Sequence, residues 1–477
     1  MPALAFTSTP TIPSSIDTAP FASYDDAPAT VDADDPAIWI NPRKERDSLI
    51  LGTLKNAGLV VYDLRGRTLQ SIAPPNLPTI LPQDPPTPAG INPGPGKPCA
   101  ESEGETFGRF NNVDVAYNVK IGKVRRDIAV VTDRGCDRLR VYAIEPNAPG
   151  GPLIDITSSG APRLYPWRVV QPSPLQTPEL EPGLQENPLD DQDTGYGLGL
   201  WQDGDDLYAF VSQRNRSVVQ QVKLVADSNG KVTYRAVRAF LFDPNFRLRR
   251  AGTAPLDWTP CRENANEDPQ SEGIVIDPAS QTLYVAFETI GVYRIPLSRQ
   301  LPVAMRVGKE FLLEPVKSFG KPYWAVPDDD EFECEYDPEG EAEPDTLVAE
   351  GSDAFAGKNL EVDVEGLAIF STGRRSGYLL VSSQGDNTFH LFERNGGNRH
   401  LGTFMVEQTG DSDGVAVTPI ALGNLFPGGL LVVQNGEAED PPDTSDINGF
   451  EYDGSTQFRF VDWRRIEDAL HLKSGPR

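Results

Sequence analysis

The stretch DVEGLAIF (residues 363–370) places two acidic residues, one position apart, at the head of an otherwise apolar run. Side chains alternate between the two faces of a β-strand, so Asp363 and Glu365 are expected to point the same way. Two adjacent carboxylates repel each other, and burial raises that cost unless a positive charge lies between them. If this strand is buried, the pair therefore needs a cation.

The same kind of opening recurs along the chain, which indicates an internal repeat. Each copy is a polar or turn-forming start followed by an alternating apolar strand. Most copies lead into two further apolar strands, as YLLVSSQG (378–385) and TFHLFER (388–394) follow the first stretch. The other openings are DDPAIWI (34–40), NNVDVAY (111–117), GYGLGLW (195–201), SEGIVID (271–277) and SDGVAVT (412–418). This pattern predicts an all-β, six-bladed β-propeller with long loop insertions between blades. A pair of β-sandwiches, the rival fold, does not predict six similar openings.

The insertions and ends set the expected domain organisation. We expect an N-terminal extension (1–31), a single propeller domain (32–466) and a C-terminal tail (467–477). The insertion at 71–98 is too rich in proline to enter a sheet. Further insertions fall at about 158–192, 241–269 and 325–360, and the last contains DDDEFECEYDPEGEAEPD, which we interpret as a solvated acidic loop.

The cysteines leave two alternatives open. Cys99, Cys136, Cys261 and Cys334 show no zinc-type spacing. Their even number allows two disulfides with three possible connectivities, and unpaired buried thiols are the alternative. Three of the four lie in or beside the insertions, where a disulfide would join loops.

The charge excludes several partners. The chain carries 70 acidic and 43 basic residues, a net charge of −27. Such a field repels phosphate backbones and anionic membranes, and no apolar run approaches the length of a membrane span. We therefore expect no nucleic acid and no membrane as partners. We also expect a monomer. Residues 1–15 lack the basic and apolar regions of a signal peptide.

Equivalent positions in the blades of a propeller form rings around its central channel, and two such rings carry chemistry here. The second residues of the openings are Asp35, Asn112, Tyr196, Glu272, Glu365 and Asp413, with Asp34, Asp114, Asp363 and Asp411 within two residues of them. The ends of the second strands are Lys55, Arg134, Arg214, Glu288, Gln384 and Asn435. In this second ring the first three blades supply cations and the last three supply oxygen atoms. The rings predict a bipartite site, with anion-binding residues opposite a metal cluster.

The residue types narrow the chemistry. Ligands that are all oxygen favour a hard cation, calcium before magnesium. Such ions activate water and polarise a phosphoryl oxygen, while arginine and lysine hold phosphate. The chain has three histidines and contains no GxSxG elbow and no P-loop. We therefore predict metal-assisted hydrolysis of a phosphate ester.

Segments that include DADDPAIWINP, FNNVDVAY, DVEGLAIF, LLVSSQGDNTFHLFER and QFRFVDWRRI resemble, in the same order, those of the β-propeller phytases. That family hydrolyses myo-inositol hexakisphosphate (phytate) in a calcium-dependent manner, and the resemblance spans about residues 32–466. It implies a calcium cluster held by Glu272, Glu288, Asp363, Glu365 and Gln384. It implies substrate contacts from Lys55, Arg134, Tyr196, Arg214 and Arg216. It also implies further calcium positions or acidic channel positions at Asp35, Pro36, Asp114, Asp411, Asp413, Asn435 and Glu437.

The sequence departs from the family on the phosphate-binding side. The paired basic residues of the family's first blade appear here as Lys55-Asn56, and its Lys-Glu pair appears as Arg214-Asn215 with Arg216 nearby. Asn435 stands where the family usually has aspartate. The resemblance implies an exported enzyme, secreted or periplasmic. Two alternatives remain open, a non-catalytic calcium-binding scaffold and a hydrolase of other phosphate esters; the cations of the second ring favour an enzyme over a scaffold.

Overall fold

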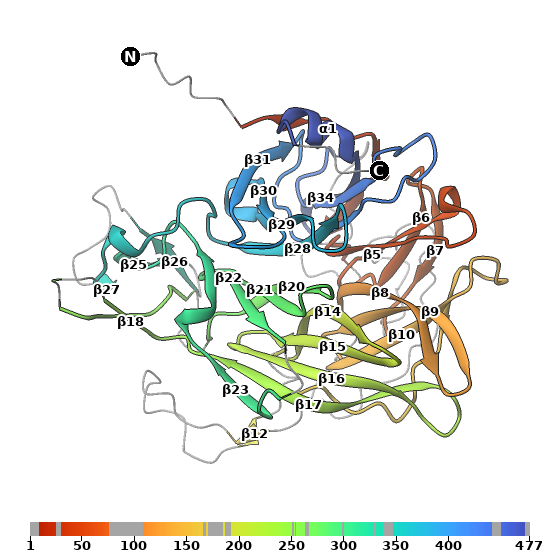
Figure 1. Cartoon of the computed structure of the whole chain (residues 1–477), viewed down its shortest axis with the longest axis horizontal. Helices are drawn as coiled ribbons and strands as arrows, with labels where there is room; N and C mark the ends of the chain where they lie inside the picture. The colour runs from red at the N-terminus through yellow and green to blue at the C-terminus, as the bar shows by residue number, and fades with distance from the viewer. Residues whose placement is uncertain are drawn as a thin grey trace.

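The computed structural model describes residues 9–24, 30–75, 108–165, 168–169, 185–186, 192–249, 252, 254–262, 267–297, 300–328, 331–336, 347–440 and 450–472. In this part of the chain the strands form nine sheets, and six of them are arranged as the blades of a propeller (Figure 1). The predicted fold is confirmed.

The blades follow one another along the chain, and each runs from the channel outward. Blade one holds β4 (Pro36–Trp39), β5 (Leu49–Thr53), β6 (Leu59–Asp63) and β7 (Thr68–Ile72). Blade two holds β8 (Phe110–Ile121), β9 (Val124–Asp133), β10 (Arg138–Ile144) and β11 (Leu153–Asp155). Blade three holds β14 (Gly195–Asp203), β15 (Asp206–Gln213), β16 (Val218–Ala226) and β17 (Val232–Phe242), with β23 (Ala304–Val307) added at its edge.

The second half of the chain builds the other blades. Blade four holds β20 (Ser271–Asp277), β21 (Thr282–Phe287), β22 (Gly291–Pro296) and β24 (Leu312–Pro315). Blade five holds β28 (Val364–Ser371), β29 (Gly377–Ser383), β30 (Thr388–Glu393) and β31 (His400–Val406). Blade six holds β32 (Val415–Thr418), β33 (Leu430–Asn435) and β34 (Tyr452–Asp462). Each inner strand contacts the inner strand of the next blade, and β32 contacts β4, so the ring closes.

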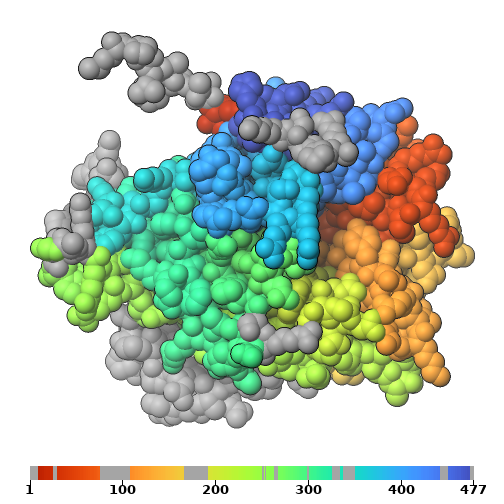
Figure 2. All heavy atoms as spheres, in the orientation of Figure 1, coloured from red at the N-terminus to blue at the C-terminus, as the bar shows by residue number. Residues whose placement is uncertain are grey.

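The N-terminal segment joins the last two blades. β1 (Thr11–Ile12) pairs with β31, while β2 (Ile16–Asp17) and β3 (Phe21–Tyr24) pair with β34. β1 also contacts α1 (Trp463–Ala469), the helix that follows β34, as Figures 1 and 2 show. Residues expected to precede the propeller therefore supply outer strands that tie the start of the chain to its end.

Close packing at the channel explains why glycine follows the ring residue in four openings. A Cβ atom at Gly273 would collide with the carbonyl oxygen of Glu365, and one at Gly366 would press on the backbone of Asp413 and Val415. Gly197 and Gly414 make equivalent approaches to the backbones of Glu272 and Asp35. Because the inner strands approach so closely, their ring residues meet in a narrow mouth. The core lies between blades, where apolar faces such as those of Val130, Leu198 and Ala209 pack together.

The insertions form small sheets at the periphery. β18 (Phe246–Leu248) pairs with β19 (Leu256–Trp258), and β25 (Tyr323–Asp328) pairs with β26 (Glu331–Glu335) and β27 (Leu347–Ala349). β12 (Arg168–Val169) pairs with β13 (Gln185–Glu186). Part of the acidic insertion predicted as a loop is therefore strand: its alternating residues give a short sheet that β25 and β27 complete.

A disulfide joins Cys261 to Cys334 and so connects two insertions, as expected for loops of this kind. Cys136 is also disulfide-bonded, whereas Cys99 and most of the proline-rich insertion lie outside the described residues. The alternative of free thiols is therefore wrong for Cys136, Cys261 and Cys334. No helix in the described ranges is long and apolar enough to cross a membrane.

Candidate metal and phosphate site

The centre of the mouth is a cluster of three carboxylates from blades four and five. Glu272 lies at the start of β20, Glu288 follows β21, and Glu365 lies at the start of β28. One oxygen atom from each lies within 4.8 Å of the others. Glu272 is 4% exposed and Glu365 is 5% exposed. The structure thus brings three predicted ligands together, two of them buried and Glu288 half-buried.

These carboxylates fit a hard cation. Calcium–oxygen distances of about 2.3–2.6 Å allow one ion to contact oxygen atoms up to about 5 Å apart. Burial, together with the charges of Glu288 and Glu272, raises the pKa of Glu365 well above its usual value. Glu365 Oε2 is buried and has no hydrogen-bond partner among the described residues. Mutually repelling carboxylates in a buried mouth, with Glu365 Oε2 lacking a hydrogen bond from the described residues, are what a calcium ion would neutralise.

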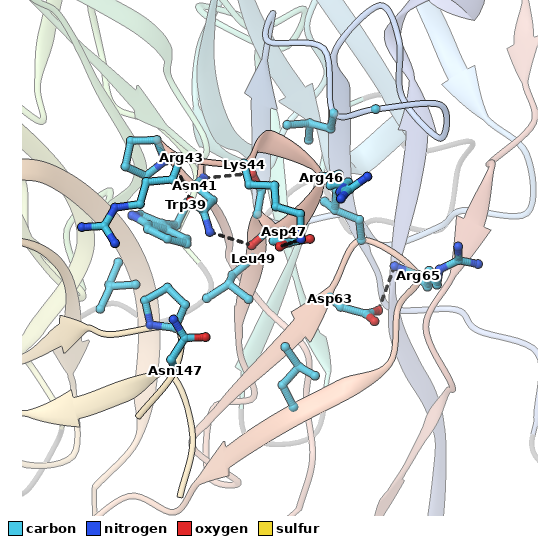
Figure 3. Close-up of a pocket in the computed structure, with 18 of the residues that line it drawn as sticks. Trp39, Asn41, Arg43, Lys44, Arg46, Asp47, Leu49, Asp63, Arg65 and Asn147 are labelled. Carbon is cyan, nitrogen blue, oxygen red and sulfur yellow. Dashed lines mark hydrogen bonds and ion pairs between the residues drawn. The ribbon is translucent and has the colours of Figure 1, made fainter. Parts of the chain in front are cut away.

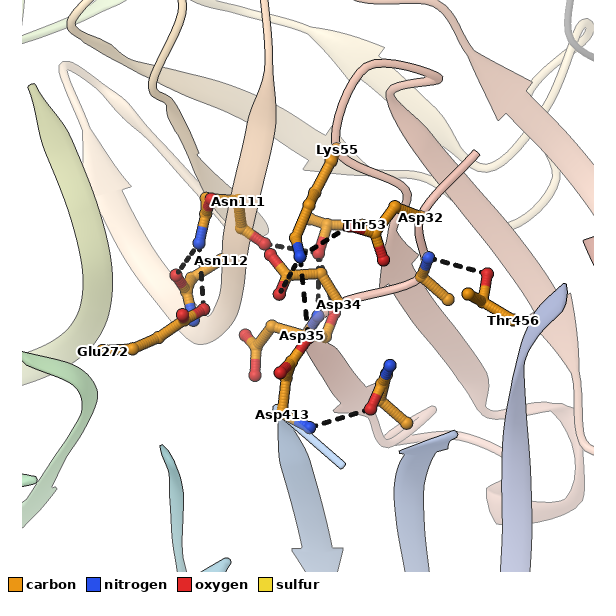
Figure 4. Close-up of polar contacts among 12 residues, drawn as sticks. Asp32, Asp34, Asp35, Thr53, Lys55, Asn111, Asn112, Glu272, Asp413 and Thr456 are labelled. Atoms are coloured by element: carbon orange, nitrogen blue, oxygen red, sulfur yellow. Dashed lines mark hydrogen bonds and ion pairs between the residues drawn. The ribbon is translucent and has the colours of Figure 1, made fainter. Parts of the chain in front are cut away.

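A second acidic group lies beside this cluster, around Lys55 (Figure 4). Lys55 Nζ lies 2.7 Å from Asp32, 3.7 Å from Asp413 and 3.9 Å from Asp34. Asp34 is fully buried, and neither of its carboxylate oxygens accepts a hydrogen bond from the described residues. Lys55, which we expected on the phosphate side, thus contacts carboxylates.

Like charges in this group oppose ionisation. Burial and the charge of Glu272 raise the pKa of Asp34 well above its usual value. Burial raises the pKa of Asp413 to about 7, although the nearby Lys55 ammonium lowers it. The single lysine therefore offsets only part of the negative charge around it.

Three of the predicted site residues have a strained backbone conformation. Lys55, Asp363 and Asp411 have φ angles of 41°, 58° and 48°, in the left-handed region that non-glycine residues rarely occupy. Gln384 Nε2 donates to Asp411 Oδ1 at 2.6 Å and to Asp413 Oδ1 at 2.9 Å. The amide of Gln384 therefore links the loop of blade five to the acidic residues that precede blade six.

Deeper acids line the central channel, a cavity of about 520 Å³ that Pro36 and Glu272 also line. Asp35 Oδ2 accepts a hydrogen bond from the amide of Val113 at 3.0 Å, and Asp114 Oδ2 accepts one from Leu200 at 2.9 Å. Burial raises the pKa of Asp35 well above its usual value and that of Asp114 to about 6. Each aspartate therefore joins its blade to the next one and keeps an oxygen atom in the channel region.

Two predicted calcium residues lie apart from the carboxylate cluster. Asn435 is fully buried, and its Oδ1 accepts a hydrogen bond from the amide of Gly410 at 2.9 Å. Glu437 is exposed, with its carboxylate against Gly410. Both residues therefore lie at the loop around Gly410, and a calcium ion at this loop stays a prediction.

Opposite the carboxylates lies a wall of arginines from blades two and three. The Arg134 guanidinium lies 5.5 Å from the centre of the Tyr196 ring. Its Nη1 donates to Asn111 Oδ1 at 3.3 Å, and Asn111 Nδ2 donates to Glu272 Oε1 at 2.9 Å. Burial and the neighbouring charges of Arg109 and Arg214 lower the pKa of Arg134 to about 9. A bound anion would relieve this repulsion.

Arg109 is a member of this wall that sequence reasoning missed. Its carbonyl accepts from the amide of Arg134 at 2.7 Å, as the carbonyl of Asp363 accepts from Gln384 at 2.8 Å in blade five. Both residues immediately precede an inner strand, so they occupy equivalent ring positions. Arg109 Nη1 donates to Asn56 Oδ1 at 3.2 Å. The side chain of Asn56 in blade one therefore contacts a cation from the start of blade two. A third ring, one residue before each inner strand, would have revealed Arg109.

Arg216, expected to bind substrate, forms an ion pair with the buried carboxylate of Asp193. Its Nη1 also donates to the carbonyl of Asn215 at 2.8 Å. Arg214, two residues earlier, instead lies close enough to Arg134 to lower the pKa of that guanidinium. The structure therefore groups Arg214 with the wall and holds Arg216 against Asp193.

The fold and this mouth define a class of protein, a six-bladed propeller with a carboxylate cluster facing an arginine wall. Within that class, the chain belongs to the phytase family. The family model described as Phytase matches residues 5–80 and 315–475. These ranges include blades one, five and six.

A curated relative extends the similarity to the other blades. The 3-phytase of Bacillus subtilis (strain 168) is 26% identical over 470 residues, covering 96% of this chain and 85% of the relative. Among solved structures, the Malassezia sympodialis allergen Mala s 1 is similar with a TM-score of 0.40 and 10% identity, covering 93% of this chain and 95% of that one. The Myceliophteria thermophila Cps50 (Swd1) propeller domain has a TM-score of 0.33 and 8% identity, covering 90% of this chain and 83% of that one. Both scores are too low to bear on function.

Proposed function

We propose that the protein is a calcium-dependent phytase that hydrolyses phosphomonoesters of phytate to lower inositol phosphates and inorganic phosphate. The observation that carries this proposal is the hydrogen-bonded chain from Arg134 through Asn111 to Glu272. It joins the anion-binding wall and the carboxylate cluster in one mouth, which a calcium-binding scaffold would not need. The family and the Bacillus subtilis 3-phytase support the same activity.

The chain's own residues supply binding and orientation. Arg109, Arg134 and Arg214 would hold phosphate oxygens through charge-assisted hydrogen bonds. Burial and the charges of Glu272, Glu288 and Glu365 raise the pKa of Tyr196 well above its usual value, so its phenol stays protonated. The aromatic ring of Tyr196 packs against Arg134. Because its hydroxyl stays protonated, that hydroxyl is a hydrogen-bond donor. Lys55 would reach phosphate only after leaving Asp32.

Glu272, Glu288 and Glu365, with Asp363 beside them, would hold the catalytic calcium ions. Asp35 and Asp114 would hold ions in the channel, and Asp34, Asp411 and Asp413 would complete the negative surface between these groups. When bound, calcium neutralises the carboxylates, polarises a phosphoryl oxygen and favours deprotonation of a water molecule. The hydrogen bond from Asn111 would hold the carboxylate of Glu272 between the arginine wall and the other two carboxylates of the cluster.

Phosphate release from phytate across a calcium titration tests this proposal. We expect release to require calcium, to stop on chelation and to return when calcium is restored. Magnesium at the same concentrations is the matched control, and we expect it to support less turnover because it demands a smaller and more regular oxygen cage. The absence of phosphate release at every calcium concentration would overturn the enzyme assignment. Release that persists after chelation would overturn the metal dependence.

Replacing Arg109 with glutamine is expected to raise the KM for phytate about tenfold, since a charged hydrogen bond contributes about 1.5–3 kcal/mol. Calcium affinity, measured by calorimetry, should remain unchanged because Arg109 lies on the opposite wall. Arg109→Lys should restore part of the affinity. Arg216→Gln should have a smaller effect on KM, since Asp193 already pairs with that guanidinium. An unchanged KM in Arg109→Gln would remove Arg109 from the substrate wall.

The disulfides at Cys136 and Cys261–Cys334 favour an oxidising compartment. We therefore propose that the enzyme works outside the cytoplasm, secreted or periplasmic, as a monomer whose partner is the calcium complex of phytate.

A further inference from the structure

A large groove lies on the face of the propeller opposite the mouth, between blades one, two and six. Its volume is about 1400 Å³, and Trp39, Leu49 and Leu422 contribute to its lining (Figure 3). Pro36 at the start of β4 lines the channel region near the mouth, whereas Trp39 ends the same strand at the groove. The groove is therefore separated from the site by the length of the inner strands.

The groove is basic, in contrast to the rest of the chain. Five basic side chains and three acidic ones line it, although the chain as a whole has a net charge of −27. Lys44 pairs with Asp47 and Arg67 pairs with Asp63. Arg43, Arg46 and Arg65 are exposed and form no ion pair with the described residues. Figure 3 shows Arg43 on one side of the groove and Arg46 and Arg65 on the other.

Apolar side chains that line the groove are also exposed. Leu69 is 47% exposed and Ile154 is 40% exposed, and both are among the few large apolar side chains left open to solvent in the described chain. A single phosphate or a small anion would leave this apolar area uncovered. A peptide that carries both carboxylates and apolar side chains would match the cations and cover the apolar area.

We propose that this groove, lined by Arg43, Arg46, Arg65, Leu69 and Ile154, docks an acidic peptide segment of a partner protein that also carries apolar side chains. The net charge of −27 disfavours such a segment over most of the remaining surface, so the groove is the favoured docking face. Because the groove is on the opposite face, a docked partner leaves the mouth open to substrate. The surface thus serves as an attachment point for an active enzyme.

The test uses the full chain and a short fluorescein-labelled peptide of glutamate with leucine at every third position, followed by fluorescence anisotropy. We expect saturable binding that weakens as salt is raised. The triple variant Arg43→Glu, Arg46→Glu, Arg65→Glu should lose affinity by at least about tenfold, equivalent to about 1.4 kcal/mol. The matched control is Arg306→Glu, Arg374→Glu, Arg375→Glu, which changes the net charge equally at exposed arginines that do not line the groove.

Two further changes distinguish a peptide site from a general anion site. One is the protein variant Leu69→Ser, and the other is a labelled peptide with serine in place of leucine. Both changes should weaken binding, and inorganic polyphosphate should compete poorly. Equal affinity in the groove variant and the control variant would overturn the proposal. Tight polyphosphate binding that is insensitive to Leu69→Ser would overturn it in favour of an inorganic polyanion. Phosphate release should be unchanged in both triple variants, which verifies that they fold.

Discussion

Replacing Glu272 with glutamine is expected to reduce phosphate release from phytate by at least about 10²-fold, a loss typical of removing one preorganised electrostatic group from an active site. Glu272 lies at the junction of the mouth: its carboxylate belongs to the three-residue cluster and also accepts a hydrogen bond from Asn111. Glutamine has the same shape but removes one negative charge. The measurement is kcat at saturating calcium and phytate, with calcium affinity determined separately by calorimetry.

The same substitution should make the calcium-free protein more stable. The charge of Glu272 opposes ionisation of Asp34, Asp35 and Glu365, so its removal relieves repulsion in a buried region. We expect a higher melting temperature in chelator and a smaller increase on adding calcium. Glu45→Gln, at an exposed position in the loop between β4 and β5 on the face opposite the mouth, is the matched control and should change neither quantity. A variant with normal kcat would exclude Glu272 from the site, whatever its melting temperature.

The sequence predicts the fold because each blade repeats the same local pattern. The alternation in DVEGLAIF and its five relatives indicates inner strands, and the structure places a strand at each opening. The glycine after Glu272, Glu365, Tyr196 or Asp413 is part of that signal, since the next blade's backbone occupies the space of a Cβ. The repeat also predicts the carboxylate cluster, because equivalent positions of the blades surround one axis.

Ring positions do not predict the direction in which a side chain points. Lys55 and Arg134 hold equivalent ring positions, yet Lys55 contacts Asp32 while Arg134 stacks on Tyr196. The left-handed backbone at Lys55 contributes to this difference, and a sequence pattern does not report it. The same holds for Asn435, whose Oδ1 accepts a hydrogen bond from the backbone amide of Gly410, a contact that a sequence pattern does not report. Arg109 lies one residue before an inner strand and outside the two predicted rings, and the pairing of its carbonyl with the amide of Arg134 places it in the wall.

The stability of the calcium-free protein is expected to fall as the pH rises from about 4 to about 8. Burial raises the pKa of Asp114 to about 6 and that of Asp413 to about 7 in the folded protein. The folded state therefore holds these protons more tightly than the unfolded chain, where aspartate titrates near 3.9. That contribution is fully present below the unfolded pKa and is lost as the pH rises through the folded values. Since one pKa unit corresponds to about 1.4 kcal/mol, the combined loss is on the order of several kcal/mol.

Calcium should reverse the direction of this dependence. Calcium binds the ionised carboxylates, so its affinity and the stability that it adds both increase as the protons leave. Melting curves in chelator and in excess calcium should therefore diverge with rising pH, with the largest separation near pH 8. Asp413→Asn should flatten the chelator curve between about pH 5 and pH 8, because asparagine cannot ionise, and an exposed control such as Asp353→Asn should leave it unchanged. A chelated protein that becomes more stable over this range would show that the buried acids of the mouth do not hold their protons in the folded state.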